Sequence, residues 1–348
     1  MAFITFNNIG IKAISACVPP KKVFNKDLSY LIPEEEIEKT INSIGIRERR
    51  EAEPEVCASD LCLKAAEKLI TDTNIDKNSI DILLFLSQLP DYKIPATAPI
   101  LQERLSLPKT TAALDLSLGC SGYIYGLATA MSFANQAGVN RVLLLVGETF
   151  TKFVNKHDKV NAPLYGDAGT ATLIEKAKGQ KSYITLYSDG SGKNSVMIKA
   201  GEARCPANVE NLTPVKQEDG NIRSDNEVFM DGMDVFNFAL SVVPKSIKEI
   251  CNLANIELNS IDNLILHQAN KFMTDFIVKR LKYPLDKVPY CLDKYGNTSS
   301  ASIPLTISSE LSGKKPKTAV LCGFGAGLSW GTALLSLEKC NILPVIEY

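Results

Sequence analysis

The sequence is poor in the residues on which metal sites and disulfide frameworks depend. It has two histidines and one tryptophan, and its nine cysteines include no Cys-x-x-Cys pair. A Cys/His metal site therefore has few ligands to draw on, and we expect no metal. The cysteine count is odd and several cysteines lie in apolar runs, which favours reduced thiols over a disulfide framework.

The chain also lacks the signals that direct a protein to a membrane, out of the cell or to nucleic acid. Residues 1–20 have no basic region followed by an apolar run, and they are predicted to form a β-strand instead of a signal peptide. No stretch approaches the roughly 18 apolar residues of a spanning helix. The formal net charge is −1, so no overall field favours nucleic acid or an anionic membrane. We expect a cytoplasmic protein with neither partner.

What the sequence does contain is a regular alternation of apolar strands and helical patterns. The clearest strand-like runs are 81–86, 142–147, 262–267 and 318–323. The candidate helices are 58–71, 121–137, 237–254, 270–282 and 303–312. Strands separated by helices predict an α/β fold with covered sheets. A chain of 348 residues is too long for one simple core and suits two packed halves.

An internal repeat indicates where these halves lie. Residues 74–88 (NIDKNSIDILLFLSQ) and 255–269 (NIELNSIDNLILHQA) coincide at seven positions without gaps. Chance similarity between two buried strands does not account for the repeated NSID. We therefore predict two copies of one α/β unit, residues 1–175 and 176–348.

A second pairing supports the same repeat. Strand 142–146 aligns with strand 319–323 at an offset of 177 residues, and the same offset separates Cys120 from Asn297. If the halves pack about a two-fold axis, the turns that carry these two residues reach one cavity.

Cys120 lies at the start of a predicted buried helix. The strand-like segment 114–118 leads into Gly119 and Cys120, and the helix that follows is apolar almost all round, as in buried helices. Gly138 is expected to end this helix as its C-cap. Backbone N–H groups and the helix dipole at such an N-terminus stabilise a thiolate. A cysteine taken at random is more often an inert buried thiol, but this context favours a nucleophile.

His267 is the second candidate. It ends the strand 262–267, and ligand sites in open α/β sheets form outside the carboxyl ends of strands. Its partner in the repeat is Leu86, so only the second copy carries an imidazole at this point. The other histidine, His157, lies among charged residues and is expected in a solvated loop. Asn297, by contrast, follows Gly296, a pair that by itself usually marks only a turn.

Two glycine-rich segments do not fit nucleotide motifs. Residues 323–331 (GFGAGLSWG) follow a buried strand, and their glycines allow backbone N–H groups to approach a ligand. Trp330, however, stands where the third glycine of a dinucleotide fingerprint belongs. Residues 189–195 (DGSGKNS) lack the serine or threonine that follows the lysine of a P-loop.

Taken together, these motifs resemble the β-ketoacyl-acyl carrier protein synthase III family. GCSG around Cys120, HQAN from His267, YGNTSSASIP around Asn297 and the final GFGAGLSWG occur in the family's order. GIRERR at 45–50 and YGDAGTA at 165–171 extend the resemblance over nearly the whole chain. The resemblance implies a thiolase fold, in which two duplicated halves form five α-β-α-β-α layers, and a homodimer.

The resemblance also implies a reaction. Cys120 would accept an acyl group from a thioester, and His267 and Asn297 would hold a malonyl thioester and stabilise the enolate formed as carbon dioxide leaves. The backbone N–H groups of Cys120 and Ala326 would form the oxyanion hole. This is a decarboxylative Claisen condensation in fatty acid or related biosynthesis. The substrates would be thioesters of coenzyme A or acyl carrier protein, without a further cofactor.

The residues implied to contact substrate or carrier protein are Lys159, Lys271, Lys279, Arg280 and Phe236. Other positions depart from the family. Lys39 and Ser43 stand where a tryptophan and an arginine usually grip coenzyme A, Phe272 replaces an arginine, and Met233 replaces an asparagine. The loss of these coenzyme A contacts favours an acyl donor that is bound to carrier protein.

Alternatives stay open at this point. The same fold also supports acyl transfer to an alcohol or amine, or condensation of unusual acyl chains in a specialised pathway. Hydroxymethylglutaryl-type and head-to-head condensing relatives use a glutamate base, whereas residues 85–100 contain only Asp91 as a carboxylate. A Cys/His/Asn hydrolase would need a papain-type signature, which is absent. A non-catalytic partner subunit usually lacks the nucleophile.

Overall fold

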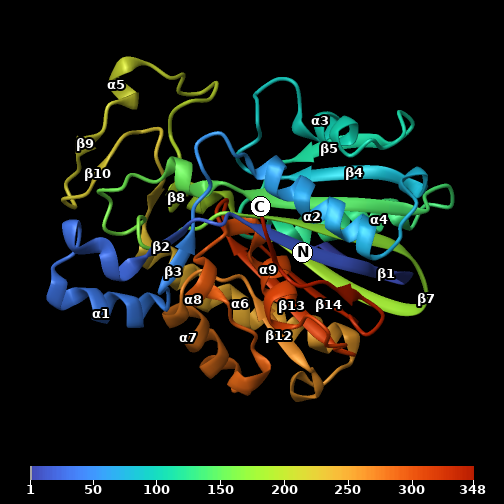
Figure 1. Cartoon of the computed structure of the whole chain (residues 1–348). Coiled ribbons are helices and arrows are strands. Elements are labelled where there is room, and N and C mark those ends of the chain that lie inside the picture. The colour runs from blue at the N-terminus through green and yellow to red at the C-terminus, as the bar shows by residue number, and fades with distance from the viewer. Residues whose placement is uncertain (1) are drawn as a thin grey trace.

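One mixed sheet of ten strands runs through the molecule in the computed structural model, which describes residues 2–348 (Figure 1). Its strands are β1 (Ala2–Val18), β4 (Ile80–Leu86), β5 (Ala112–Leu116), β6 (Arg141–Glu148), β7 (Ala168–Ser188), β12 (Asn263–Leu266), β13 (Ala319–Gly325), β14 (Ser329–Leu335), β15 (Asn341–Ile342) and β16 (Ile346–Glu347). Three short pairs lie outside it: β2 (Lys22–Phe24) with β3 (Glu48–Arg50), β8 (Val196–Met197) with β11 (Phe229–Met230), and β9 (Val215–Lys216) with β10 (Ile222–Arg223).

The helices lie between these strands in sequence. They are α1 (Glu34–Ile44), α2 (Ala58–Asp72), α3 (Thr97–Arg104), α4 (Gly122–Ala134), α5 (Val209–Leu212), α6 (Gly232–Ala254), α7 (Lys271–Leu281), α8 (Leu292–Tyr295) and α9 (Ser302–Glu310). Short 3₁₀ segments are η1 (Asn25–Tyr30), η2 (Lys77–Ser79), η3 (Phe150–Phe153), η4 (Gly190–Gly192), η5 (Leu258–Ser260), η6 (Leu285–Lys287) and η7 (Ser299–Ala301).

The arrangement of β4, β6 and β7 in the sheet is repeated by β12, β13 and β14. Its order is β12-β13-β14-β7-β6-β4-β5. On one side β4 is parallel to β6, which is antiparallel to β7. On the other side β12 is parallel to β13, which is antiparallel to β14, and β14 is antiparallel to β7. Strand β1 runs antiparallel along β7. The predicted division at residues 175 and 176 falls inside β7, between the part that pairs with β6 and the part that pairs with β14, and it stays a prediction.

Helices cover the sheet in layers. One apolar cluster joins α4 and α9 to the inner faces of the strands. A second packs α2 and α3 against β4 and β6, and a third packs α6 and α7 against β12 and β13. The two ends of the continuous sheet therefore form two layers with α4 and α9 between them, and the order is helix, sheet, helix, sheet and helix, as in the five-layered thiolase fold expected from the resemblance. Strands that are buried on both faces read as continuous apolar runs, which is why DILLFL and RVLLLVG show no polar alternation.

The expected strands and helices are all found, and among the helix ends that differ from expectation three have a clear local cause. Helix α4 ends at Ala134 with Asn135 as its cap, so Gly138 is not the C-cap and the expectation was wrong. Helix α6 begins at Gly232 because the Asp231 side chain accepts the N–H groups of Met233 and Asp234 at 3.0 and 2.9 Å.

The third difference is at α7, which ends at Leu281 because Lys282 has a left-handed backbone (φ 55°). The helix predicted for residues 270–282 therefore ends one residue earlier than expected, and Lys282 is its C-cap.

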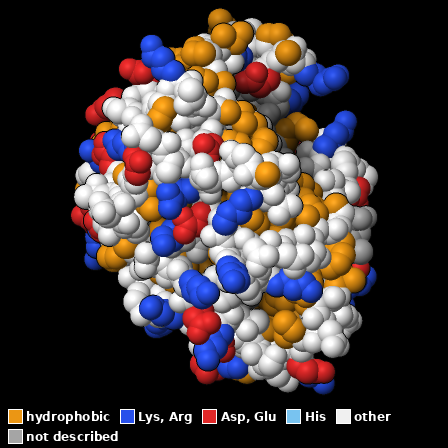
Figure 2. Space-filling view, turned by 90° about the vertical axis from the view of Figure 1, so that its right-hand side faces the viewer, with side chains coloured by type: hydrophobic (Ala, Val, Ile, Leu, Met, Phe, Trp, Pro, Cys, Tyr) orange, Lys and Arg blue, Asp and Glu red, His pale blue; other side chains and the backbone are white. Residues whose placement is uncertain are grey.

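The surface carries charges of both signs. On the face shown in Figure 2, acidic and basic side chains are interspersed among hydrophobic ones. Among residues 2–348, no helix is long and apolar enough to cross a bilayer. All nine cysteines are free thiols.

Candidate active site

Cys120 lies in the turn that joins β5 to the buried helix α4. It comes two residues before the first residue of α4, and Tyr123, Ile124 and Leu127 bury the helix behind it. The residue as a whole is half-buried, but its thiol group is enclosed by protein. The turn is close-packed on the side of β4, since a Cβ atom at Gly119 would lie 2.4 Å from Oε1 of Gln88. A larger residue at position 119 would therefore require the Gln88 side chain to move.

The glycine-rich segment after β13 lies directly against this turn. A Cβ atom on Gly325 would lie 2.7 Å from Cβ of Cys120 and 3.1 Å from its Sγ. Ser329 Oγ and Ser121 Oγ are 2.7 Å apart, which ties the segment to the residue after Cys120. The backbone N–H groups of Ala326 and of Cys120 itself lie close enough to the Cys120 sulfur to lower its pKa. Both predicted oxyanion donors are thus brought to the same atom.

The thiol of Cys120 is protonated at neutral pH in the free protein. Burial raises its pKa to about 11, and the carboxyl of Glu148 raises it further, whereas hydrogen bonds from Ser299 and the two N–H groups act in the opposite direction. Desolvation disfavours the thiolate more than these donors favour it. Acyl transfer to Cys120 must therefore include removal of the thiol proton.

Asn297 and its neighbour Ser299 face Cys120 from the second half of the chain. The backbone of Asn297 bonds Leu164 and Gly166 at 2.8 and 3.1 Å, and its side-chain oxygen accepts the N–H of Ser299 at 2.9 Å. Ser299 has a left-handed backbone (φ 49°), which is uncommon for a residue other than glycine. Its hydroxyl lies 3.7 Å from Sγ of Cys120.

His267 follows the last residue of β12 and is 2% exposed. Its backbone N–H donates to the carbonyl of Cys322 at 2.9 Å, and the ring atom Nδ1 lies 2.7 Å from the hydroxyl oxygen of Ser302. Burial lowers the pKa of His267 to about 3, although a hydrogen bond to the backbone of Ser299 acts in the opposite direction. The imidazole is therefore neutral at physiological pH and can donate or accept one hydrogen bond without carrying charge.

Sequence reasoning missed two residues of this centre, Glu148 and Ser299. Glu148 ends β6, is fully buried, and accepts hydrogen bonds from Ser87, Gln88 and Ser300. A carboxylate at the end of the apolar run RVLLLVGE was a visible signal, since such residues are rarely buried without partners. Ser299 had no comparable signal within its run of small polar residues.

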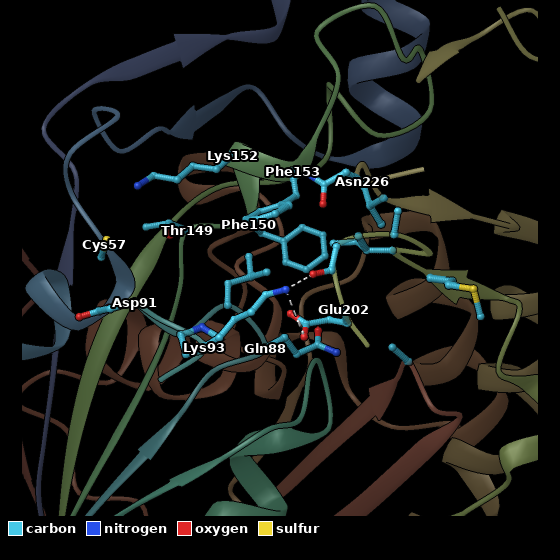
Figure 3. Close-up of a pocket in the computed structure, with 18 of the residues that line it drawn as sticks. Cys57, Gln88, Asp91, Lys93, Thr149, Phe150, Lys152, Phe153, Glu202 and Asn226 are labelled. Carbon is cyan, nitrogen blue, oxygen red and sulfur yellow. Dashed lines mark hydrogen bonds and ion pairs between the residues drawn. The ribbon is translucent and has the colours of Figure 1, made fainter. Parts of the chain in front are cut away.

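A cavity of about 550 Å³ opens beside the centre (Figure 3). Ala326 and Gln88, both neighbours of Cys120, form part of its lining. Its wall includes Phe150 and Phe153, and Lys93 reaches across it to pair with Glu202 at 3.7 Å. A cavity of this size is far larger than a two-carbon acyl group and lies within the range for drug-sized ligands.

The residues implied to contact substrate or carrier protein are not gathered at this centre. Lys159 is exposed in the loop after Asp158, and its N–H donates to the Asn221 side chain. Lys271, Lys279 and Arg280 are exposed on α7. Lys271 pairs with Asp275, one turn further along the helix.

An aromatic cluster lies where α6 meets α7, and it includes Phe236. Its ring centroid is 5.3 Å from that of Phe272 and 5.8 Å from that of Phe276, which are themselves 4.7 Å apart. Phe272 is 49% exposed and Phe276 is 43% exposed. Helix α1, which carries Lys39 and Ser43, packs against α7. The position where the family usually has an arginine is therefore part of an exposed apolar surface.

Comparisons with known proteins agree over the whole chain. The family model of 3-oxoacyl-[acyl-carrier-protein] synthase III matches residues 114–191, and the model of its C-terminal part matches residues 251–337. A putative 3-oxoacyl-[acyl-carrier-protein] synthase 3 of Campylobacter jejuni is 37% identical over 99% of this chain and 98% of its own length. A β-ketoacyl-[acyl-carrier-protein] synthase III of Caldanaerobacter subterraneus is 33% identical over 95% of this chain and 98% of its own.

Solved structures give the same result. The crystal structure of a 3-oxoacyl-(acyl-carrier protein) synthase from Burkholderia xenovorans is similar to this chain with a TM-score of 0.93 at 35% identity. The similarity covers 100% of this chain and 99% of that one.

Proposed function

Since the chain belongs to the 3-oxoacyl-[acyl-carrier-protein] synthase III family of condensing enzymes, we propose that it forms an acyl-enzyme at Cys120 and condenses this acyl group with malonyl-acyl carrier protein. The observation that carries the proposal is the position of Ser299. Its hydroxyl is 3.7 Å from Sγ of Cys120, its N–H donates to the side-chain oxygen of Asn297, and its backbone lies near enough to the His267 imidazole to raise its pKa. The Cys120 thiol, the Asn297 amide and the His267 imidazole therefore all lie next to Ser299.

In the first half-reaction the acyl group moves to the enzyme. Sγ of Cys120 bonds the carbonyl carbon of the donor thioester, the donor's C–S bond breaks, and the thiol proton ends on the departing thiol. The N–H groups of Cys120 and Ala326 stabilise the oxyanion of the tetrahedral intermediate. Removing one donor from such a hole typically costs about 10²–10³ in rate.

In the second half-reaction a new carbon–carbon bond forms. The malonyl carboxylate leaves as carbon dioxide, and its bonding electrons form an enolate whose oxygen accepts hydrogen bonds from His267 and Asn297. The enolate carbon then attacks the acyl carbonyl, the Cys120–acyl bond breaks, and the sulfur takes a proton from solvent. A neutral imidazole suits this step because it donates to the developing charge without binding water strongly.

The cavity beside Ala326 is proposed to hold the acyl chain of the donor. Its aromatic wall supplies apolar surface, and burial of each methylene group contributes about 0.8 kcal/mol. The volume of about 550 Å³ favours chains much longer than acetyl. We also propose that the donor is carried by acyl carrier protein, attracted to the exposed Lys279 and Arg280, with Lys271, Lys159 and Phe236 as further contacts.

Mass spectrometry of the intact protein tests the acyl-enzyme. The wild type should gain the mass of the acyl group from a panel of carrier-bound and coenzyme A thioesters of increasing chain length, whereas Cys120→Ser should not. Cys57→Ser is the matched control, because Cys57 is a half-buried thiol that lines the same cavity. Acylation of Cys120→Ser at the wild-type rate would show that another residue is the nucleophile.

Adding malonyl-acyl carrier protein to the acylated enzyme tests the condensation. We expect carbon dioxide release and a 3-oxoacyl product. An acyl-enzyme that releases no carbon dioxide and passes its acyl group to an alcohol or amine would instead support the alternative transferase.

Three further properties are proposed from family membership. The enzyme acts as a homodimer in the cytoplasm, in fatty acid or related acyl-chain biosynthesis, and needs no metal or cofactor beyond its thioester substrates. Light scattering tests the dimer, which a monomeric mass at micromolar concentration would contradict. Activity that survives exhaustive chelation would support metal independence.

A further inference from the structure

Glu148 is the carboxylate that the two half-reactions do not use, and it lies at the centre of the reaction site. Its side chain is fully buried at the end of β6. Oε2 accepts the hydroxyl of Ser87 at 3.0 Å, while Oε1 accepts the N–H of Gln88 at 3.1 Å and the hydroxyl of Ser300 at 3.0 Å. Three hydrogen bonds satisfy this buried carboxylate, so the surrounding residues are arranged to hold it in this position.

These donors belong to loops on both sides of Cys120. Ser87 and Gln88 follow β4 in the first half of the chain, and the Gln88 side chain lies against Gly119, beside the nucleophile. Ser300 belongs to η7 in the second half and follows Ser299. Glu148 thus joins the loop after β4, whose Gln88 side chain lies against the Cys120 turn, to Ser300 in the turn that follows Asn297.

No cation neutralises Glu148 within residues 2–348. The charge of the Asp167 carboxyl acts on Glu148. The charge of Glu148 in turn acts on the thiols of Cys62 and Cys120. Burial raises the pKa of Glu148 to about 7, and Asp167 raises it further, while its three hydrogen bonds act in the opposite direction. The ionised carboxylate in turn raises the pKa of Cys120.

We propose that Glu148 is a positioning residue that holds the Asn297–Ser300 turn against the Cys120 turn, and that its charge sets how readily the Cys120 thiol ionises. The charge effect rests on the proposed function only in taking Cys120 as the nucleophile, whereas the positioning role also rests on the proposed condensation. Below neutral pH Glu148 is protonated and the thiol ionises more readily. Above neutral pH the carboxylate opposes the thiolate. A plot of the logarithm of thiolate reactivity against pH therefore has two parallel limbs joined by a flatter region near pH 7.

The test is the rate of iodoacetamide alkylation at Cys120, followed by peptide mass spectrometry from pH 5.5 to 9. This readout needs no substrate and is unaffected if the proposed condensation is wrong. We expect Glu148→Gln to match the wild type below pH 6.5 and to react about three- to tenfold faster above pH 8, with no flat region, since tenfold corresponds to one pKa unit. Wild-type and Glu148→Gln profiles that superpose over the whole range would overturn the charge coupling.

The matched control is Glu175→Gln. Glu175 is a partly buried carboxylate that pairs with Arg141 at the opposite end of β6. Seven residues of strand separate Arg141 from Glu148, which is about 23 Å. This control should leave the alkylation profile unchanged, and a change as large as that of Glu148→Gln would show a general charge effect and overturn the assignment.

Two further variants keep the inference testable if Glu148→Gln does not fold. Ser300→Ala removes one donor to the carboxylate, so the flat region should move to higher pH, and an unmoved region would count against the coupling. Glu148→Asp keeps the charge but is one methylene too short to hold both turns. It should retain the two limbs while its condensation rate falls about tenfold, with acylation unchanged. A normal condensation rate in Glu148→Asp would refute the positioning role.

Discussion

The reaction centre and the outer face of α7 differ in how firmly the fold holds their side chains. His267 and Asn297 are buried, and each makes several hydrogen bonds to backbone and side-chain partners. Lys279 and Arg280 are exposed in the last turn of α7. Interactions in the dry centre are strong and directional, whereas exposed charges are screened by water and salt. Substitutions in the two regions should therefore differ by orders of magnitude in effect.

The largest effect is expected from the His267 and Asn297 pair. His267→Ala and Asn297→Ala should still form acyl-enzyme but lose about 10²–10³ in the rate of malonyl decarboxylation, because the pair addresses the enolate and not the thiolate. Single-turnover measurements of acylation and carbon dioxide release separate the two steps. His157→Ala, the other histidine and an exposed one, serves as control. Normal carbon dioxide release from either site variant would remove the pair from the enolate step.

Gly325→Ala tests how closely the centre is packed. The new methyl group would lie 2.7 Å from Cβ of Cys120, so the cysteine or the glycine-rich segment must shift. Acylation should slow by up to about 100-fold, since a misplacement of about 1 Å can cost this much. Gly138→Ala is the control, because no atom lies within 4 Å of a Cβ atom there. Acylation of Gly325→Ala at the wild-type rate would contradict the packing that the structure shows.

The buried imidazole should make stability depend on pH. The pKa of His267 falls from the usual 6.5 to about 3 on folding. Below pH 6.5 the unfolded chain therefore binds a proton that the folded chain does not. The stability that His267 contributes is complete above pH 6.5 and is lost as the pH falls toward 3, by up to about 1.4 kcal/mol per pH unit.

Urea unfolding of the wild type and of His267→Gln, which cannot titrate, isolates this contribution. The difference in unfolding free energy between the two proteins should be constant above pH 6.5 and should change steadily below it. A difference that stays flat from pH 4 to 8 would show that His267 is not held neutral by burial.

The smallest effect is expected on α7. Lys279→Glu should slow acylation by a carrier-bound donor about two- to fivefold at low salt and leave acylation by the coenzyme A thioester unchanged, because the lysine acts by speeding encounter with an acidic carrier. Added salt should reduce the difference between variant and wild type. Lys271→Ala is the comparison, since Lys271 already pairs with Asp275. Equal rates with both donors, unaffected by salt or by Lys279→Glu, would exclude this face as the carrier site.

Much of the fold was predictable because its signals are local. Apolar runs such as DILLFL and RVLLLVG mark strands that helices cover on both faces, and every strand and helix expected from the sequence is present. Helix ends were less predictable. Gly138 had the right chemistry for a cap, but α4 had already ended at Ala134, and α6 begins where the Asp231 side chain can accept two N–H groups.

By itself the sequence determined the chemistry that this protein carries: a thiol before an apolar helix, one imidazole at a strand end and one amide in a related turn. Only the tertiary structure decided how these groups act on one another. It buried the thiol so that it is protonated, kept the imidazole neutral, and placed Glu148 between two turns. The reason is physical. Desolvation and long-range hydrogen bonds depend on which distant segments pack together, and no local pattern in the chain records that.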